Sequence, residues 1–266
     1  MSKKNKIALV TGGSSGIGKQ TALALRARGC TVYEKSRKPS DIEGLTHLTG
    51  DVTDETSVRA AVGEIIAREG RIDILVNNAG FGISGATEFT ELDAAKKQMD
   101  VNFFGMVNVC RAVIPHMREA GGGKIVNISS VAAVTPIPFQ TFYSASKAAI
   151  NAYSLALANE VLPFGISVCA IMPGDIKTNF TAMREKQCIG DDVYRGRISR
   201  SVARMEHDEQ NGMSPEIAGR YIAKISAKRR IKPLYAIRAD YKLVAVLAKL
   251  LPARLLNYIL GKLYAR

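Results

Sequence analysis

The chain has 266 residues, of which 47% are hydrophobic and 23% charged, as is typical of a soluble globular protein. Its net charge is +13, but the basic residues are dispersed and nowhere interleaved with aromatic residues, which argues against a nucleic-acid-binding protein. No uncharged apolar stretch of about 18 residues occurs, and the four cysteines have no metal or disulfide spacing, so we expect a cytoplasmic protein without a metal site.

Short β-branched runs alternate with helical patterns along the chain, which predicts a parallel sheet covered on both faces. Strands are expected at Lys6–Thr11, Thr31–Lys35, Leu45–Leu48, Ile72–Asn77, Gly123–Ser129, Ser167–Met172 and Leu234–Ile237. Helices are expected at residues 17–28, 54–69, 91–119, 142–161 and 214–227. Because no linker or repeat divides the chain, we predict one α/β domain over residues 1–266, a Rossmann-type doubly wound parallel sheet of about seven strands.

Two stretches fit this alternation less well. Residues 175–213 form a long polar and basic segment, and connections of that length are usually functional lids or disordered, so we expect a substrate loop there. Residues 241–264 carry Leu243, Val246, Leu247 and Leu250 on one helical face, and the apolar pattern resumes after a proline. They predict an amphipathic helical tail at the C-terminal end.

A glycine-rich motif, Thr11–Gly18, follows the first strand directly and opens the first helix. The glycines allow a tight turn and a close backbone approach, and the helix N-terminus offers free N–H groups to a pyrophosphate. The strand–turn–helix context favours a dinucleotide site over a plain glycine-rich turn. The residues expected to bind the cofactor here are Gly12, Ser14, Ser15, Gly16, Ile17 and Gly18.

The end of the second strand indicates which dinucleotide is bound. An NAD site places a carboxylate there, whereas an arginine accommodates the 2′-phosphate of NADP. Glu34 falls inside the strand, while Ser36 and Arg37 stand at its end, and Lys35 or Lys38 can assist. A solvated charged turn is the alternative, but the pattern favours NADP(H) over NAD(H).

Tyr143 and Lys147 are spaced i, i+4 and therefore share one face of a helix. A lysine cation at about 5 Å, with an effective dielectric constant of roughly 20, favours the phenolate by about 3 kcal/mol, so the spacing predicts that the pKa of Tyr143 is lowered by roughly two units. Ser130 lies thirteen residues upstream of Tyr143, at the end of an apolar run. A tyrosine with a lowered pKa, as predicted for Tyr143, is a candidate general acid or base.

Together these motifs resemble the short-chain dehydrogenase/reductase family, nearly end to end. The matching features, in chain order, are Thr11–Gly18, Asp51-Val52, Asn77-Asn78-Ala79-Gly80, Asn102, Ser130, Tyr143-x-x-x-Lys147 and Pro173-Gly174. In that family the position eighteen residues past the last motif glycine carries the NAD aspartate. Here it is Ser36, with Arg37 next, which is similar to the NADP-dependent branch.

The resemblance implies a role for each matching residue. Tyr143 would donate or accept the substrate proton, Lys147 would lower the Tyr143 pKa and hold the nicotinamide ribose, and Ser130 would hydrogen-bond the substrate oxygen. Asn102 would hold a water that links Lys147 to solvent. Cofactor contacts are implied for Asp51 and Val52 at the adenine, Asn78, Ala79 and Gly80 at the adenosine ribose, and Pro173, Gly174, Ile176 and Thr178 at the nicotinamide.

Some of these residues have other interpretations. Ser129 adjoins Ser130, although the thirteen-residue spacing favours Ser130. Asn102 can simply cap or pack within its helix. Asp51 can cap the N-terminus of the helix that starts near Thr53, and this is compatible with a cofactor contact.

The predicted function is an NADP(H)-dependent oxidoreductase that interconverts a ketone or aldehyde and an alcohol. The tail is similar to that of 17β-hydroxysteroid and retinol dehydrogenases, which suggests an apolar, steroid-, retinoid- or lipid-like substrate. A non-catalytic dinucleotide sensor and a peripheral membrane protein that uses the basic-apolar tail are the alternatives. The tail can also cover the substrate pocket or a subunit interface, and the resemblance implies a homodimer or homotetramer.

Overall fold

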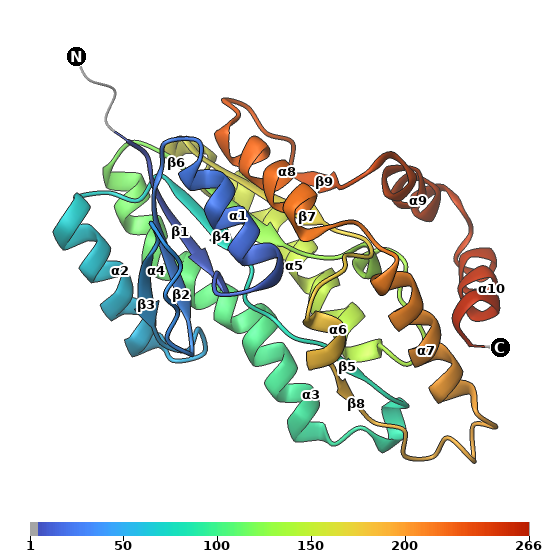
Figure 1. Ribbon diagram of the computed structural model, residues 1–266. Coiled ribbons are helices and arrows are strands. Elements are labelled where there is room, and N and C mark those ends of the chain that lie inside the picture. Colours follow the sequence, from blue (N-terminus) through green and yellow to red (C-terminus); the bar gives the residue numbers. More distant parts are fainter. Residues whose placement is uncertain (1–4, 266) are drawn as a thin grey trace.

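Seven parallel strands form one sheet at the centre of the molecule in the computed structural model, which describes residues 5–265 (Figure 1). The strands are β1 (Ile7–Thr11), β2 (Thr31–Ser36), β3 (Thr46–Thr49), β4 (Ile74–Asn77), β6 (Gly123–Ile128), β7 (Ile166–Met172) and β9 (Leu234–Ala236). Their order, β3-β2-β1-β4-β6-β7-β9, reverses direction between β1 and β4. The doubly wound single domain predicted from the sequence is confirmed, and the order places a topological switch point beside the end of β1.

Helices cover both faces of the sheet. The α-helices of the described residues are α1 (Gly16–Arg26), α2 (Glu55–Glu69), α3 (Leu92–Met99), α4 (Gly105–Glu119), α5 (Thr141–Glu160), α6 (Phe180–Met183), α7 (Arg197–Gln210), α8 (Pro215–Ala227), α9 (Ala239–Leu250) and α10 (Ala253–Tyr264), of which α1, α2, α4, α5 and α8 pack on the sheet. One apolar core joins α1 and α8 to the sheet, and the other joins α2, α4 and α5 to the opposite face. Parallel strands buried on both faces are expected to be continuously apolar, and all five residues of β1 are buried.

The expected helix over residues 91–119 is interrupted, which corrects the sequence-based assignment. A π-helical segment, Asp100–Phe104, separates α3 from α4. Within it the buried Asn102 side chain turns toward Phe81, accepting its N–H at 2.9 Å and donating to its carbonyl at 3.0 Å. Such π-bulges occur frequently at functional sites. This one turns the Asn102 side chain away from the regular helix and toward the Phe81 backbone.

Residues 175–213 are structured, so the expectation of a long loop there is also wrong. The segment contains α6, the short strand β8 (Glu185–Lys186), which pairs with β5 (Ile83–Ser84), and α7. The sequence suggested a loop because α7 is mostly polar. It is held by a narrow buried stripe of Ile198, Val202 and Met205, spaced as one helical face.

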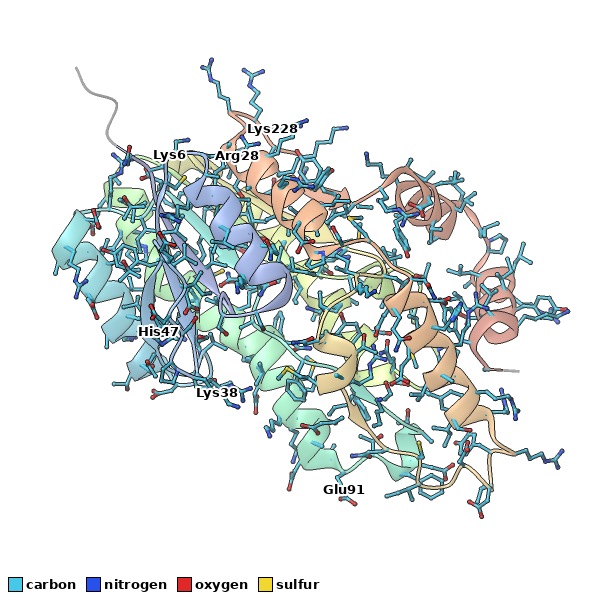
Figure 2. All side chains as sticks on the ribbon, viewed as in Figure 1. Lys6, Arg28, Lys38, His47, Glu91 and Lys228 are labelled. Atoms are coloured by element: carbon cyan, nitrogen blue, oxygen red, sulfur yellow. The ribbon has the colours of Figure 1, made fainter. Side chains whose placement is uncertain are left out.

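The tail forms two helices, α9 and α10, separated at Pro252, and its predicted extent is confirmed. Figure 1 shows both helices at the right-hand edge of the molecule, away from the sheet. Basic side chains are spread over the surface elsewhere. Figure 2 shows Lys6 and Lys228 at one end of the molecule and Lys38 toward the other.

Candidate active site

The candidate site lies where β1, β4, β6 and β7 end at their carboxyl termini. Thr11, at the end of β1, accepts the N–H groups of Asn78 and Ala79 on its hydroxyl at 3.0 and 3.2 Å. The Asn78 amide in turn donates to the carbonyls of Thr11 and Gly12 at 3.2 and 3.1 Å. These bonds tie the residues after β4 to the glycine-rich turn after β1, so two of the predicted motifs form one unit.

The glycine-rich turn needs its glycines for space as well as for conformation. Gly12 and Gly16 have positive φ angles of 64° and 51°, and a Cβ on Gly18 would lie 2.2 Å from the Gly12 carbonyl oxygen. Ser15 precedes α1 without a capping bond from its side chain. The first N–H groups of α1 therefore face the turn without a side-chain acceptor, and this arrangement fits an anionic diphosphate.

The end of β2 presents a cation and no carboxylate. Arg37 is exposed and forms no ion pair among the residues that the structure describes. Glu34 is only 1% exposed, because its carboxylate turns inward to His47. Lys35 is also buried and donates to the Ser57 hydroxyl at 2.9 Å. Arg37 is thus the exposed cation at the end of β2, whereas the expectation that Lys35 can assist is wrong.

The residues after β3 differ in part from their expected positions. Asp54, and not Asp51, caps the N-terminus of α2 by accepting the N–H groups of Thr56 and Ser57. Asp51 accepts the Thr53 N–H and hydroxyl instead, both at 2.9 Å. The capping role considered for Asp51 is therefore wrong, and its carboxylate organises the turn ahead of α2.

Val52 is only 6% exposed. It packs so closely against Gly105 that a Cβ added to Gly105 would lie 2.5 Å from the nearest Val52 methyl group. Most of the Val52 side chain is therefore taken up by the core beside the site.

Tyr143, Lys147 and Ser130 come together at the start of α5 and the end of β6. The Lys147 ammonium lies 5.6 Å from the centre of the Tyr143 ring and donates to the Ile128 carbonyl at 2.9 Å. The Ser130 side chain lies near enough to the Tyr143 hydroxyl to oppose the rise in its pKa. Ser129 has a different partner, since its hydroxyl donates to the Lys147 carbonyl at 2.9 Å. Of the two serines, the geometry brings Ser130 to the tyrosine.

Burial shifts both titratable groups toward their neutral forms. It raises the pKa of Tyr143 to about 12, although the Ser130 side chain opposes the rise. It lowers the pKa of Lys147 to about 8. The expectation that Lys147 lowers the Tyr143 pKa is wrong for this structure, because loss of phenolate hydration dominates and the ammonium lies over the ring.

Asn102 and Lys147 converge on Gly80. A Cβ added to Gly80 would lie 3.0 Å from the Asn102 amide oxygen and 3.8 Å from the Lys147 ammonium nitrogen. Asn102 also donates to the Ser146 hydroxyl at 3.1 Å. The π-helical segment thus brings a third predicted polar residue next to the acid–base pair.

The segment after β7 crosses to the glycine-rich turn. Thr178 approaches Gly16, where an added Cβ would lie 3.6 Å from the Thr178 Cβ. The Pro173 carbonyl accepts the Val131 N–H at 2.9 Å, and Gly174 lies against the Tyr241 ring. Ile176 is only 6% exposed, belongs to the core shared by α1 and α8, and forms an isolated parallel bridge with Met213.

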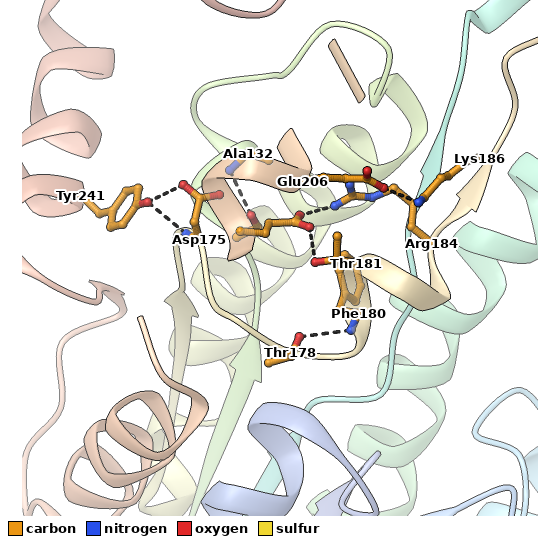
Figure 3. Close-up of polar contacts among 11 residues, drawn as sticks. Ala132, Asp175, Thr178, Phe180, Thr181, Arg184, Lys186, Glu206 and Tyr241 are labelled. Atoms are coloured by element: carbon orange, nitrogen blue, oxygen red, sulfur yellow. Dashed lines mark hydrogen bonds and ion pairs between the residues drawn. The ribbon is translucent and has the colours of Figure 1, made fainter. Parts of the chain in front are cut away.

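A polar cluster beside Tyr143 was not foreseen. The centres of the Phe180 and Tyr143 rings lie 5.8 Å apart, and the Arg184 guanidinium lies over the Phe180 ring, 5.7 Å from its centre. Arg184 is paired with Glu209, which also accepts the Thr181 hydroxyl at 2.5 Å (Figure 3). A cavity of about 660 Å³ beside the cluster is lined by residues that include Thr181. No motif marks these side chains in the sequence, because they come from the segment misread as a loop.

Comparisons with known proteins agree with this geometry. A family model described as short chain dehydrogenase matches residues 6–188. A 3-ketodihydrosphingosine reductase from Bacteroides thetaiotaomicron is 45% identical over 266 residues, covering 98% of each chain. The crystal structure of a short-chain dehydrogenase from Streptomyces avermitilis has a TM-score of 0.82 at 29% identity and covers 98% of this chain and 97% of its own. The structure of ElxO with NADP bound has a TM-score of 0.75 at 27% identity, with 90% and 99% covered.

Proposed function

Because the chain belongs to the short-chain dehydrogenase/reductase family and is an oxidoreductase of the kind that acts on CH–OH groups, we propose that it reduces a lipid-like ketone with NADPH. The observation that carries the proposal is the convergence of Ser130, Tyr143 and Lys147 beside the glycine-rich turn. The same residues run the reverse reaction, in which an alcohol is oxidised. A dinucleotide sensor without catalysis has no need of a proton donor at this position.

In the proposed mechanism the protein positions the substrate and moves a proton. NADPH, when bound, supplies the hydride that adds to the carbonyl carbon. Tyr143 remains protonated near neutral pH, since its pKa is about 12, and gives its hydroxyl proton to the carbonyl oxygen. Ser130 donates a hydrogen bond to that oxygen as negative charge develops. Lys147 and Asn102 then return a proton to Tyr143 from solvent.

The roles of the residues at the cofactor site follow the family resemblance. The N–H groups at the start of α1 would hold the diphosphate, and Arg37 would hold the 2′-phosphate. Asp51 and Val52 would contact the adenine, and the residues Asn78–Gly80 would contact the adenosine ribose. Pro173–Thr178 would hold the nicotinamide end, and Lys147 would hold its ribose.

The proposed substrate class rests on two supports. The 45% identical relative is named for the reduction of 3-ketodihydrosphingosine, a ketone with a long hydrocarbon chain. In this chain, apolar residues of 131–139 follow Ser130, and Val131 packs with Met172 in an apolar cluster. An extended apolar substrate is therefore favoured over a small polar one.

Replacing Tyr143 by phenylalanine tests the mechanism. Tyr143→Phe removes the proton donor and leaves the ring, so we expect kcat for ketone reduction to fall by at least about a hundredfold. NADPH binding, followed by nucleotide fluorescence, is expected to persist. Tyr153→Phe on the same helix is the matched control and should keep its activity. Undiminished turnover in Tyr143→Phe would rule out this mechanism.

Replacing Arg37 tests the cofactor preference. Arg37→Gln removes a charged hydrogen-bond donor, which is worth about 1.5–3 kcal/mol, so KM for NADPH should rise about 10- to 150-fold. KM for NADH should stay nearly unchanged. Arg28→Gln, another exposed arginine, provides the control. An equal effect of Arg37→Gln on both cofactors would contradict the assignment.

We also propose that the enzyme works in the cytoplasm as a homodimer or homotetramer through α4 and α5. The support is apolar surface on α5, where Leu155 is 41% exposed, and on the segment just before α4, where Phe104 is 52% exposed. Size-exclusion chromatography with light scattering measures the assembly.

A further inference from the structure

The outer surface of α9 and α10 is apolar and basic. Leu243, Val246, Leu247 and Leu250 of α9 are 58%, 53%, 41% and 74% exposed. On α10, Leu255, Ile259 and Leu263 are 44%, 39% and 53% exposed. We call these seven residues the tail surface. Apolar side chains this exposed, on two consecutive helices, mark an interaction site.

The charges around the tail surface are almost all positive, since the one acidic residue of α9, Asp240 in its first turn, is paired with Arg238. Residues 241–265 contain no aspartate or glutamate, and four basic residues stand among the apolar ones: Lys242, Lys249, Arg254 and Lys262. All four are exposed, and none forms an ion pair within the part of the chain that the structure describes. An amphipathic helix with this combination is suited to the interface of a membrane with anionic headgroups.

The two helices are held to the enzyme on their inner side. The Tyr241 hydroxyl donates to the Asp175 carboxylate at 2.5 Å and accepts the Asp175 N–H at 3.0 Å. At the other end, the Ala265 carbonyl accepts a hydrogen bond from Arg197 of α7. Between these ends, Ala245 and Leu260 are buried. The tail surface is therefore the outer side of a fixed structure, next to the segment that follows β7.

Charge distinguishes a bilayer from a second copy of the chain. In a two-fold symmetric contact the same patch meets itself, so four exposed cations would face four others, and the one acidic residue of the two helices, Asp240, is already paired with Arg238. No helix among residues 5–265 is long and apolar enough to cross a membrane. We propose that α9 and α10 bind the surface of an anionic lipid bilayer, lying in its interface, and thereby bring the site after β7 close to the lipid.

The absence of tryptophan from the sequence allows a direct test. Leu250→Trp and Ile259→Trp each introduce one fluorophore into the tail surface of the full-length protein. With vesicles that contain phosphatidylglycerol, both should show a blue-shifted emission and quenching by brominated acyl chains. Leu162→Trp, at a 65% exposed position outside the tail, is the matched control and should show neither. No shift in either tail variant, or equal shifts in all three, would overturn the proposal.

A charge variant tests the electrostatic part. Lys242→Gln, Lys249→Gln and Lys262→Gln combined should weaken vesicle binding by roughly a hundredfold, since each basic side chain near an anionic surface contributes about fivefold. The same number of changes at Lys228, Arg229 and Arg230 should have a much smaller effect. Light scattering without lipid is measured in parallel, and loss of an oligomer instead of vesicle binding in the tail variant would assign the tail surface to a subunit contact.

Vesicle binding is measured without turnover, so its result is independent of the reductase proposal. Thermal unfolding and NADPH binding confirm that each variant is folded. Reduction of a water-soluble ketone should be unchanged in the tail variants, because none of the replaced residues lies in the catalytic or cofactor site.

Discussion

Lys147 shows how a catalytic requirement can oppose stability at a single residue. Its side chain is 5% exposed and has one hydrogen-bond acceptor, the Ile128 carbonyl. Burial lowers its pKa from 10.5 to about 8, so near neutral pH the folded protein holds a cation that the site solvates poorly. The buried ammonium therefore lowers the stability of the folded protein near neutral pH, which the proposed role of Lys147 at the cofactor would explain.

The lowered pKa of Lys147 makes the free energy of unfolding depend on pH. Between about pH 8 and 10.5, Lys147 binds fewer protons in the folded than in the unfolded protein. Its contribution to the free energy of unfolding therefore rises with pH across this window and is least favourable below it.

Lys147→Met should remove this rise. We expect the variant to be as stable as the native enzyme at pH 7 or more stable by up to about 3 kcal/mol, and to have lost ketone reduction. Urea unfolding at pH 7, 8, 9 and 10 measures the difference between the two proteins. The difference should shrink as pH rises. A difference that is constant with pH would contradict the pKa assigned to Lys147.

At the scale of elements, the sequence predicts the regular parts of the fold and misses the parts shaped by tertiary contacts. The seven strands were predictable because a parallel sheet buried on both faces requires continuous β-branched runs. The interruption at Asp100–Phe104 was not, because it depends on the Asn102 side chain reaching a backbone far away in sequence. α7 was missed because it buries only one narrow stripe.

The candidate site also has parts that the sequence predicts and parts that it does not. Ser130, Tyr143 and the glycine-rich turn were predictable, because their spacing along the chain carries the chemistry. The inward turn of Glu34 and the approach of Arg184 to Phe180 depend on side-chain packing between distant segments. The pKa of Tyr143 was misjudged for the same reason, since burial cannot be read from an i, i+4 pair.

Two identical substitutions in different elements should have opposite effects. Gly18→Ala places a Cβ 2.2 Å from the Gly12 carbonyl oxygen, so we expect a loss of more than about 3 kcal/mol in stability together with loss of NADPH binding. Gly63→Ala, on the exposed side of α2 with no atom within 4 Å of the new Cβ, should stabilise by about 0.5–1 kcal/mol. Thermal and urea unfolding test both. Equal stability of the two variants would mean that the turn can relax around an added methyl group.

At the scale of the whole molecule, the net charge of +13 produces a positive potential that extends beyond any single contact. The basic side chains are dispersed: Figure 2 shows Lys38 away from Lys6 and Lys228, and the tail carries four more between residues 241 and 265. This distribution attracts polyanions in general, and both a bilayer with anionic headgroups and NADPH are of this kind. In our proposal, specificity for NADPH therefore comes from a local contact with Arg37, while the overall field affects the rate of encounter.

Salt should distinguish the effect of the overall positive potential on NADPH capture from the effect of the proposed Arg37 contact. Raising ionic strength from about 0.01 to about 0.15 M shortens the Debye length from about 30 to about 8 Å, so kcat/KM for NADPH should fall several-fold. Arg37→Gln removes one charge of the local contact and leaves most of the field, so its kcat/KM should start lower and fall by nearly the same factor. Steady-state kinetics with saturating ketone measures both proteins, with sucrose replacing salt as the control for solvent effects. If the native enzyme showed no salt dependence, the net charge would have no part in cofactor capture; if the dependence disappeared in Arg37→Gln, it would belong to that contact alone.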